Sequence, residues 1–410
     1  MSPGAEPTRP FWLAELPGQD VGAGEPLPAR AEVVIVGGGI AGTTVAYWLG
    51  RLGVPALVLE RRGLSGGATG RNGGHIRPGT TERFSEARKR YGDEIARAVF
   101  EFSHRCADAV RAFVAEHRVE CELRVHGSVS LASSEAELGP VHESAEALTA
   151  LGKPVELWDA ATCAERTGST RFRGGLLLRT AGQLWPARLV LAIAREAQAR
   201  GATVRTRVAV RAVERAGRGF LVRTDRGDVT AAQVVHATNA WASALLPPLR
   251  ELIQPIRGQV IVTAPAPPLW PFGLSTNDGY EYWMQRPDGR IVLGGLRWHT
   301  PTREEGTDDD TAIEPVVSAA LRAFLPAHFP ALAGVGVEHE WTGIMGFTPD
   351  RNPLVGPVPG SPGEHVVAGF NGHGMSMAFL CAQALAEMIA GRAPEHFVTE
   401  AFLPARFLAA

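Results

Sequence analysis

The sequence predicts an α/β fold in which a strand–helix–strand domain with a parallel sheet is interleaved with a second, α+β domain on an antiparallel sheet. Strand–helix–strand patterns occur near both ends of the chain, whereas the middle consists of short apolar runs separated by glycine turns. The 410 residues exceed the usual size of a single core. We therefore expect one discontinuous domain over 31–82, 152–243 and 335–400, and a second over 83–151 and 244–334.

The expected elements, in chain order, begin with an irregular arm and a strand–helix–strand unit. Residues 1–30 are rich in proline and glycine, which predicts an irregular arm anchored by Phe11 and Trp12. A buried strand at 33–37 and a helix at 41–52 follow, then a strand at 55–60. Apolar residues at helical spacing predict one helix over 82–118, and alternation predicts a strand over 123–131. The later elements are helices 134–151 and 186–200, strands between 203 and 237, strands 256–263 and 291–295, helix 312–325, strand 365–369 and helix 374–390.

Composition excludes several classes of partner. The formal charge of −2 gives no general electrostatic case for binding nucleic acid or an anionic membrane. The four cysteines form no C-x-x-C pair, so we expect neither a metal site nor a dithiol motif, and reduced thiols as in a cytoplasmic protein. The N-terminus lacks the pattern of a secretory signal, and the apolar stretch 33–49 is interrupted by three glycines. We expect a cytoplasmic protein without membrane contact.

A glycine motif between the first strand and helix carries the first functional signal. Residues Gly37 to Gly42 read GGGIAG and fit G-x-G-x-x-G, with Ile40 and Ala41 between the second and third motif glycines. The first motif glycine turns the chain, Gly39 admits a pyrophosphate, and Gly42 lets helix pack on strand. The helix N-terminus aims its N–H groups at phosphates. Taken alone, the motif could be a simple tight turn.

The end of the next strand supports a dinucleotide. Glu60 lies eighteen residues past Gly42, where a carboxylate accepts hydrogen bonds from ribose hydroxyls. Its charge would repel a 2′-phosphate, which argues against NADP. A long loop rich in Gly, Ser, Thr and Asn, residues 63–79, then replaces the next strand–helix unit. Bare backbone of this kind suits a flavin, whose ring lies further along the same crevice.

Seven separate stretches resemble the FAD-dependent oxidoreductases of the D-amino-acid oxidase superfamily, which includes glycine oxidase, sarcosine oxidase and γ-glutamylputrescine oxidase. The resemblance spans about 31–400 and is closest to the putrescine-oxidase-like enzymes, whose Arg-Asn-Gly-Gly loop is matched at 71–74. The stretches are VVIVGGGIAG (33–42) with Glu60, SGGATGRNGG (65–74), GQLWPARL (182–189), HATNAWAS (236–243), YEYWMQRPDGRIVLGG (280–295), WTGIMGFTPDRNPLVG (341–356) and GFNGHGMSMA (369–378).

The resemblance implies a Rossmann-like FAD-binding domain and a substrate domain, and it assigns roles to residues. It places the ADP part at Gly37, Gly39, Ile40, Ala41, Gly42, Glu60 and Arg61, with Val208 at the adenine and Thr238 and Trp241 at the pyrophosphate. It places the flavin at Gly67, Ala68, Thr69, Arg71, Asn72, Gly73, Gly74 and Gly343, and at the helix start Asn371, Gly372, His373, Gly374 and Met375. Some relatives bind FAD through a cysteine just before the Thr-Pro-Asp stretch, which is 348–350 here. No cysteine lies near it, so we expect non-covalent FAD.

The substrate side is less clear from the sequence. By the same resemblance Arg286 is the candidate for clamping a substrate carboxylate, and an exposed turn arginine is the alternative. Tyr280 and Tyr282 share one face of a strand and are expected in the pocket, with Trp341 as a further wall. His75 and His373 lie in the two flavin loops as candidate contacts of flavin or substrate.

The family reaction passes a hydride from the carbon beside an amine to flavin N5; the imine hydrolyses, and O₂ reoxidises the flavin to give H₂O₂. Sarcosine-oxidase relatives use a lysine to activate O₂. The only lysines here, Lys89 and Lys153, match no flavin stretch, so His373 or Arg286 would have to serve. We therefore expect an amine or amino-acid oxidase acting on a small molecule with O₂. A flavin dehydrogenase that passes electrons elsewhere is the main alternative, and an NAD(H) dehydrogenase or a non-enzymatic flavoprotein are others.

Overall fold

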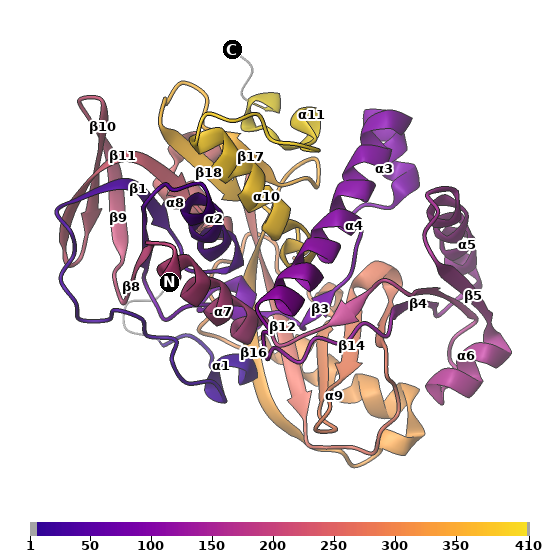
Figure 1. The fold of residues 1–410 in the computed structure, drawn as a ribbon. Helices are drawn as coiled ribbons and strands as arrows, with labels where there is room; N and C mark the ends of the chain where they lie inside the picture. The colour runs from indigo at the N-terminus through magenta and orange to yellow at the C-terminus, as the bar shows by residue number, and fades with distance from the viewer. Residues whose placement is uncertain (1–5, 408–410) are drawn as a thin grey trace.

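The computed structural model describes residues 6–407 and contains two eight-stranded sheets (Figure 1). In the first sheet the strand order is β17-β18-β11-β1-β2-β8, with β9 and β10 continuing from β11. The strands are β1 (Arg30–Val36), β2 (Ala56–Glu60), β8 (Thr203–Thr206), β9 (Val210–Ala216), β10 (Gly219–Thr224), β11 (Gly227–His236), β17 (Leu354–Pro357) and β18 (Glu364–Ala368). The central pairs β18-β11, β11-β1, β1-β2 and β2-β8 are parallel.

Strand alternation buries both faces of this sheet. Val33, Ile35 and Val58 face a core that includes helices α2 (Ile40–Arg51), α7 (Pro186–Ala199) and α10 (Gly374–Ile389). Val34 and Leu57 face a second cluster that contains the strand β10. A parallel strand buried on both faces reads as a continuous apolar run, which is the pattern at 33–36. The predicted elements at 33–60, 365–369 and 374–390 are confirmed within one or two residues, except that β1 begins at Arg30, three residues earlier than predicted.

The second sheet is mainly antiparallel, with the order β16-β12-β15-β14-β13-β4-β6-β5. Its strands are β4 (Ser128–Ala132), β5 (Val155–Asp159), β6 (Gly174–Leu178), β12 (Gln254–Thr263), β13 (Gly273–Thr276), β14 (Glu281–Gln285), β15 (Ile291–Gly295) and β16 (Val337–Phe347). Helix α9 (Pro315–His328) packs against it around the buried Trp283 and Leu321. The mixed α/β architecture with one parallel and one antiparallel sheet is as predicted.

Sheet membership differs from the predicted domain boundaries. Strand β6 pairs with β4, β5 pairs with β6, and β16 pairs with β12, so all three lie in the second sheet although we expected 152–243 and 335–400 in the first domain. Helix α4 (Asp93–Glu116), expected in the second domain, packs on α10 through Cys106 and Val110. Periodicity identifies an apolar face but not the layer that covers it.

The long predicted helix over 82–118 is two helices, α3 (Phe84–Tyr91) and α4. They are separated by Gly92, whose φ of +82° is a conformation that glycine adopts easily. The alternating segment 123–131 contributes only β4 to a sheet. The remaining elements are α5 (Glu135–Ala150), α6 (Ala160–Thr167), α8 (Ala242–Leu245), α11 (Thr399–Phe402), and the short pair β3 (His75–Ile76) and β7 (Gly182–Gln183).

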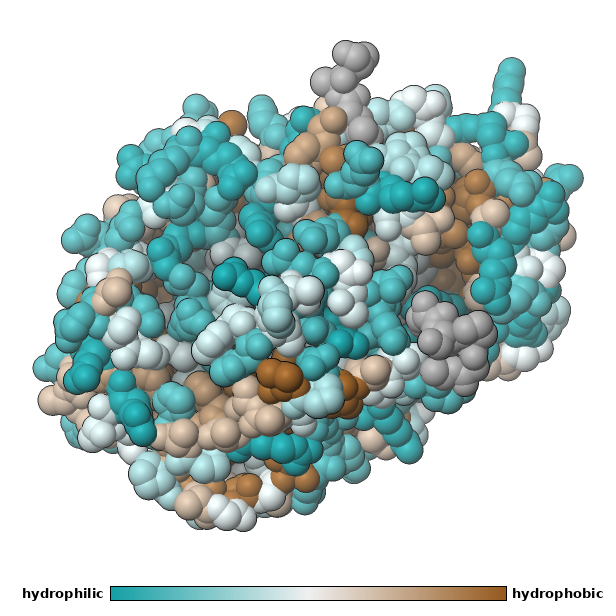
Figure 2. Space-filling model, turned by 180° about the vertical axis from the view of Figure 1, so that it is seen from behind, coloured by the Kyte–Doolittle hydropathy of each residue, from teal (hydrophilic) through white to brown (hydrophobic). Residues whose placement is uncertain are grey.

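The N-terminal arm contains one short helix, α1 (Phe11–Ala14), and is anchored as expected. Phe11 and Trp12 are fully buried, and the Trp12 indole donates a hydrogen bond of 2.6 Å to the carbonyl of Asn72. The face opposite to that of Figure 1 is mostly hydrophilic, with apolar residues showing in its lower half and at the upper right (Figure 2). The four cysteines are buried and unpaired. Within residues 6–407, no helix is both long enough and apolar enough to cross a membrane.

Candidate active site

One continuous cavity of about 1090 Å³ runs from the glycine turn after β1 to the second sheet. Most of the residues singled out in the sequence line it, although they come from both sheets. These are Gly37, Gly39, Ile40, Ala41, Glu60, Arg61, Gly67, Ala68, Thr69, Arg71, Asn72, Gly73, His75, Val208, Thr238, Trp241, Tyr280, Tyr282, Gly343, Asn371, Gly372, His373, Gly374 and Met375. Gly42, Gly74, Arg286 and Trp341 lie outside its lining.

The glycine turn holds backbone against backbone. Gly37 has a φ of +112°, and a Cβ there would lie 2.7 Å from the carbonyl oxygen of Ala237. A Cβ at Gly42 would lie 2.0 Å from the Gly37 carbonyl oxygen, so Gly42 serves the packing of α2 and not the cavity surface. Gly39 faces the Thr69 hydroxyl, which itself accepts a hydrogen bond from the N–H of Ile40 at 3.1 Å. Side chains at these positions would fill the space or strain the turn.

Glu60 ties this turn to the next strand. Its carboxylate accepts hydrogen bonds from the backbone N–H of Gly38 and from that of Arg62, both at 2.7 Å. Each carboxylate oxygen has a further lone pair, so ribose hydroxyls can still donate to it. Val208 lines the same end of the cavity, and its N–H donates to the Glu60 carbonyl at 2.9 Å. A contact of Val208 with adenine would therefore use its carbonyl oxygen.

Three buried hydrogen-bond donors at this end have no partner among residues 6–407. They are Nη2 of Arg61, the hydroxyl of Thr238 and Nε1 of Trp241. The Arg61 guanidinium lies 4.4 Å from the centre of a Trp241 ring, and burial lowers its pKa. Buried polar groups are normally hydrogen-bonded, so three free donors beside a helix N-terminus fit a bound anion. The residues present therefore fit a dinucleotide pyrophosphate.

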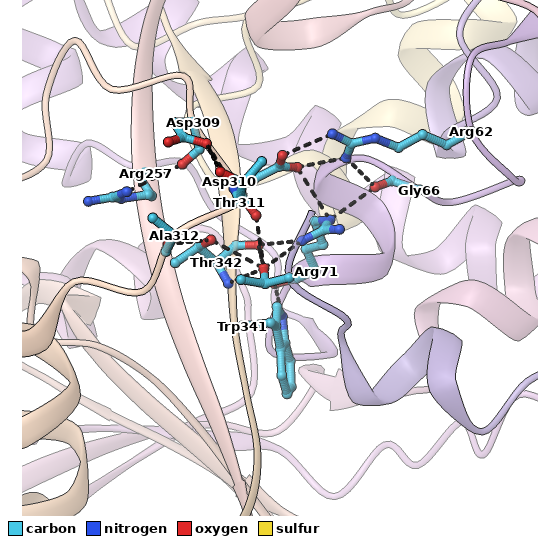
Figure 3. A network of polar contacts seen from close by, with 11 residues as sticks. Arg62, Gly66, Arg71, Arg257, Asp309, Asp310, Thr311, Ala312, Trp341 and Thr342 are labelled. Atoms are coloured by element: carbon cyan, nitrogen blue, oxygen red, sulfur yellow. Dashed lines mark hydrogen bonds and ion pairs between the residues drawn. The ribbon is translucent and has the colours of Figure 1, made fainter. Parts of the chain in front are cut away.

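The loop 65–74 rests on a buried ion cluster (Figure 3). The carboxylate of Asp310 accepts two hydrogen bonds from Arg62, at 2.6 and 2.9 Å, and lies 3.6 Å from Nε of Arg71. Arg71 also donates to the carbonyls of Gly66 at 3.0 Å and Thr342 at 2.7 Å. Burial lowers the pKa of Arg71 to about 10, which leaves it charged at neutral pH. The hydrogen bonds of Arg62 and Arg71 run to Asp310 and to carbonyls of the loop and of β16, so the cluster fixes the loop.

Trp341 belongs to this support and not to the pocket wall. It is completely buried, and its indole donates to the carbonyl of Arg71 at 2.9 Å. The expectation of a substrate contact at Trp341 is thereby corrected: on strand β16 its side chain points into the core beneath the loop, while Gly343, two residues on, lines the cavity. A Cβ at Gly343 would lie 2.8 Å from Cβ of Arg71. Glycine is needed where the strand passes the loop.

The opposite wall is the turn before α10. Asn371 and Gly372 both have positive φ, at +52° and +80°, and α10 begins at Gly374. The side-chain oxygen of Asn371 accepts from the Thr348 N–H at 2.8 Å, which fixes the turn to β16. The N-terminus of a sixteen-residue helix thus faces the cavity with little side-chain bulk, where its dipole favours negative charge. None of the four cysteines lines the cavity.

The protonation of His373 follows from its partners. The Thr81 hydroxyl contacts both the Asn371 carbonyl and Nδ1 of His373, the latter at 3.0 Å. A carbonyl only accepts, so the hydroxyl donates to it and accepts from Nδ1–H. Nδ1 also lies 3.2 Å from the Asn371 carbonyl. Burial lowers the pKa of His373 to about 4, so at neutral pH the ring is uncharged with its proton on Nδ1.

Arg286 does not face the cavity, which corrects the expectation of a carboxylate clamp. It is 6 % exposed, and its guanidinium lies 3.1 Å from both Glu122 and Asp288. It also packs over the rings of Phe11 and Trp185, at 4.8 and 4.6 Å. The residue follows the end of β14 in a hairpin turn, where the chain has already left the cavity. Its guanidinium thus helps to hold the N-terminal arm in place, through the ring of Phe11.

Arg77 is the cavity residue that the sequence interpretation missed. Its Nη2 donates to the hydroxyl of Ser130 at 2.9 Å, while its buried Nε has no partner. Among residues 6–407, no carboxylate forms an ion pair with it. Its charge contributes to lowering the pKa of neighbouring His75 to about 4, after burial, and Nε2 of His75 is also unpartnered. Period-2 alternation from His75 could have indicated Arg77, because both side chains lie on one face of the segment.

Two further features lie in the part of the cavity near the second sheet. Tyr282 stands edge-on to His75 with ring centres 5.7 Å apart, and a Cβ at Gly73 would lie 2.5 Å from its ring. Arg297 lines the cavity beneath the Tyr280 ring, 4.7 Å from its centre, but donates to the Arg303 carbonyl at 2.8 Å and has Glu305 at 3.9 Å. The cavity therefore joins neutral histidines and tyrosines with the guanidinium of Arg77, which has no ion pair among residues 6–407.

Comparisons with known proteins agree with this geometry. The family model described as "DAO: FAD dependent oxidoreductase" matches residues 32–388. The "Probable oxidoreductase OrdL" of Rhizobium meliloti (strain 1021) is 28% identical over 94% of this chain and 89% of its own. The "Gamma-glutamylputrescine oxidoreductase" of Escherichia coli (strain K12) is 29% identical over 91% and 86%. The crystal structure of glycine oxidase from Geobacillus kaustophilus has the same fold, with a TM-score of 0.79, 20% identity, and coverage of 92% and 99%.

Proposed function

The chain belongs to the DAO family of FAD-dependent oxidoreductases, and on that premise we propose that it oxidises the carbon–nitrogen bond of a small amine carrying a carboxylate. The relatives include a γ-glutamylputrescine oxidoreductase, which supports an amine substrate. The observation that carries the proposal is the uncompensated guanidinium of Arg77 in the cavity. Bound FAD, held without a covalent link, supplies the oxidising chemistry by accepting the two electrons released when C–N becomes C=N.

A carboxylate is the partner that Arg77 lacks. Elsewhere on the cavity wall, Arg83 pairs with Asp278 and Arg90 with Glu82. A half-buried cation that has only a serine hydroxyl as partner is costly unless a ligand brings the opposite charge. A guanidinium accepts a carboxylate in a two-pronged geometry, which fixes orientation as well as position. Arg77 would thus hold the substrate and set the direction of its C–N bond.

The same charge favours the reactive form of the amine. Loss of a hydride from the carbon beside the nitrogen needs the nitrogen lone pair to form the C=N bond, and an ammonium has no free lone pair. The neutral rings of His75 and His373 and the cation of Arg77 place no negative charge beside the amine. A carboxylate raises the pKa of a nearby amine and a guanidinium lowers it, so Arg77 would offset the effect of the substrate's own carboxylate on the amine.

We propose O₂ as electron acceptor, with H₂O₂ as the product. Neither lysine lines the cavity, and His373 is uncharged at neutral pH, so Arg77 is the cation that would assist. The competing function is a dehydrogenase that passes electrons to another acceptor, and the lack of a cavity lysine favours it. Peroxide formation in air, measured against reduction of an artificial dye under nitrogen, separates the two.

The test compares acidic and neutral substrates. An amino acid and its matched amide or amine would be assayed with the native enzyme, Arg77→Met and Arg77→Lys. Loss of one charged hydrogen-bond pair costs about 1.5–3 kcal/mol, so Arg77→Met should lower kcat/KM for the acid by roughly 10- to 150-fold. The neutral substrate should change little, and Arg77→Lys should restore part of the loss. Arg286→Met is the control, and should leave the acid-to-neutral ratio unchanged. Equal losses for both substrate classes in Arg77→Met would refute the proposal.

A further inference from the structure

The cavity continues past Arg77 into a second branch between helices α3, α4 and α5. Its walls are apolar, and we call this part the apolar branch; it is lined by Phe84, Phe100, Val141, Leu148, Leu151 and Leu176. The branch is continuous with the space beside the glycine turn and forms one hollow with it. A group held at Arg77 therefore has an open path in this direction.

Two separate clusters explain why no side chain fills the branch. Phe84 and Phe100 belong to a small cluster on α3 and α4, whereas Leu148 and Leu176 belong to another between α5 and β6. Helix α5 stands apart from α4 in the fold, and touches α3 along one side (Figure 1). There Ala147 and Leu151 pack against the first cluster. The two clusters thus touch at Ala147 and Leu151, while members of both, such as Phe100 and Leu176, also line the cavity.

Most charged side chains beside the branch are partly exposed and paired; Glu137 of α5 also lines the cavity and has no ion pair among the described residues. Arg83 reaches across to Asp278 through a two-pronged ion pair, and Glu82 pairs with Arg90. These four side chains line the cavity and are partly exposed. Arg77 adjoins the branch at β6: Leu176 is the cross-strand partner of Ser130, and the Ser130 hydroxyl accepts a hydrogen bond from Arg77. A bound molecule therefore meets an anion site at Arg77 and, next to it, the apolar branch.

We propose that the substrate carries an extended apolar substituent, unbranched or aromatic, which occupies the apolar branch while its carboxylate is bound by Arg77. This inference rests on the proposed function and narrows its substrate class. The energy of the contact comes from removing apolar surface of the substituent from water. Water alone would be poorly held there, because the walls offer it few hydrogen-bond partners.

The test uses straight-chain fatty acids from acetate to octanoate, which lack an amine and cannot be oxidised at a C–N bond. Their binding to the FAD-loaded protein is followed by the change they cause in the flavin absorbance, so activity plays no part. Each added methylene should tighten Kd by roughly three- to fourfold until the branch is full. Ala147→Trp, which places a large ring in the branch, should abolish the dependence on chain length. Ala150→Trp lies on the same helix, exposed and outside the cavity, and should retain it.

Each result has one consequence. If Kd is the same for acetate and octanoate in the native protein, the inference is overturned while the anion site at Arg77 stands. If no acid binds, and Arg77→Met makes no difference, the proposed function itself fails. If ω-amino acids bind tighter than alkyl acids of equal length, the branch selects a distal cation through its rim carboxylates, which also overturns the inference. A length dependence lost only in Ala147→Trp supports it.

Discussion

Replacing Asp310 by Asn tests whether the buried ion cluster holds the loop 65–74 in place. The side chain of Asp310 is fully buried, that of Arg62 is 15 % exposed and that of Arg71 is 2 % exposed. Asn keeps the size of the side chain and one acceptor oxygen but removes the negative charge. Two guanidinium groups would then share a buried place without a counter-charge (Figure 3).

The expected loss of unfolding free energy lies near the lower end of the 3–5 kcal/mol typical of a broken buried pair, at about 3 kcal/mol. The low end is expected because Arg62 can turn to solvent, while Arg71 keeps its bonds to Gly66, Thr342 and Thr8. The pair of Arg223 and Asp228 is the matched control. It has the same 2.6 Å contact as the pair of Arg62 and Asp310, but its side chains are 44 % and 40 % exposed. An exposed pair contributes about 0.2–1 kcal/mol, so Asp228→Asn should lose no more than that.

Urea unfolding of the FAD-loaded protein would be followed by far-ultraviolet circular dichroism and by the fluorescence of released flavin. In Asp310→Asn both transitions should move to lower urea, and flavin release should move further, because the loop lines the cavity. If Asp310→Asn and Asp228→Asn lose equal stability, Asp310 does not compensate the buried arginines. The assignment of this cluster as support for the loop would then be refuted.

Three further predictions concern the same cavity. Gly37→Ala places a Cβ 2.7 Å from the Ala237 carbonyl oxygen and should weaken FAD binding by at least about tenfold. The control Gly217→Ala is also at positive φ but in open space, and should leave the FAD Kd unchanged. Equal FAD affinities of the two variants would contradict the close approach of backbone at Gly37. Glu60→Gln leaves one acceptor oxygen for the two N–H groups of Gly38 and Arg62, and should raise the FAD Kd in equilibrium dialysis about tenfold; an unchanged Kd would mean the carboxylate does not order the turn. Burial lowers the pKa of His75 to about 4, so the folded protein binds fewer protons at this ring than the unfolded chain does. The contribution of His75 to the unfolding free energy is fully present above the unfolded pKa of about 6.5 and is lost as pH falls toward 4. Between pH 7 and pH 5, His75→Gln should therefore lose about 1–2 kcal/mol less unfolding free energy than the native protein, and an identical loss in urea titrations would count against this.

The sequence alone determined the glycine turn, the acid at Glu60 and the helix start at Gly374. Each depends on contiguous residues whose required backbone conformation can be inferred from the local sequence: a positive φ at Gly37, a missing Cβ at Gly42, and a strand that ends where a helix begins. The order of these segments also sufficed to predict the α/β fold and FAD. Local chemistry of this kind can be predicted without knowing what lies opposite.

Only the tertiary structure decided which charges were free. Arg286 and Arg77 are both arginines in loop-rich segments, yet Arg286 lies between Glu122 and Asp288, whereas Arg77 lines the cavity and pairs with no carboxylate of the part of the chain that the structure describes. Partners come from far along the chain, as Arg62 meets Asp310 across 248 positions. Packing likewise decided that β5, β6 and β16 belong to the second sheet, because an apolar strand face does not indicate which sheet it will pair with. Neutralisation and burial are properties of assembled surfaces, which is why the sequence could suggest the residue types of the substrate site but not which of them would act.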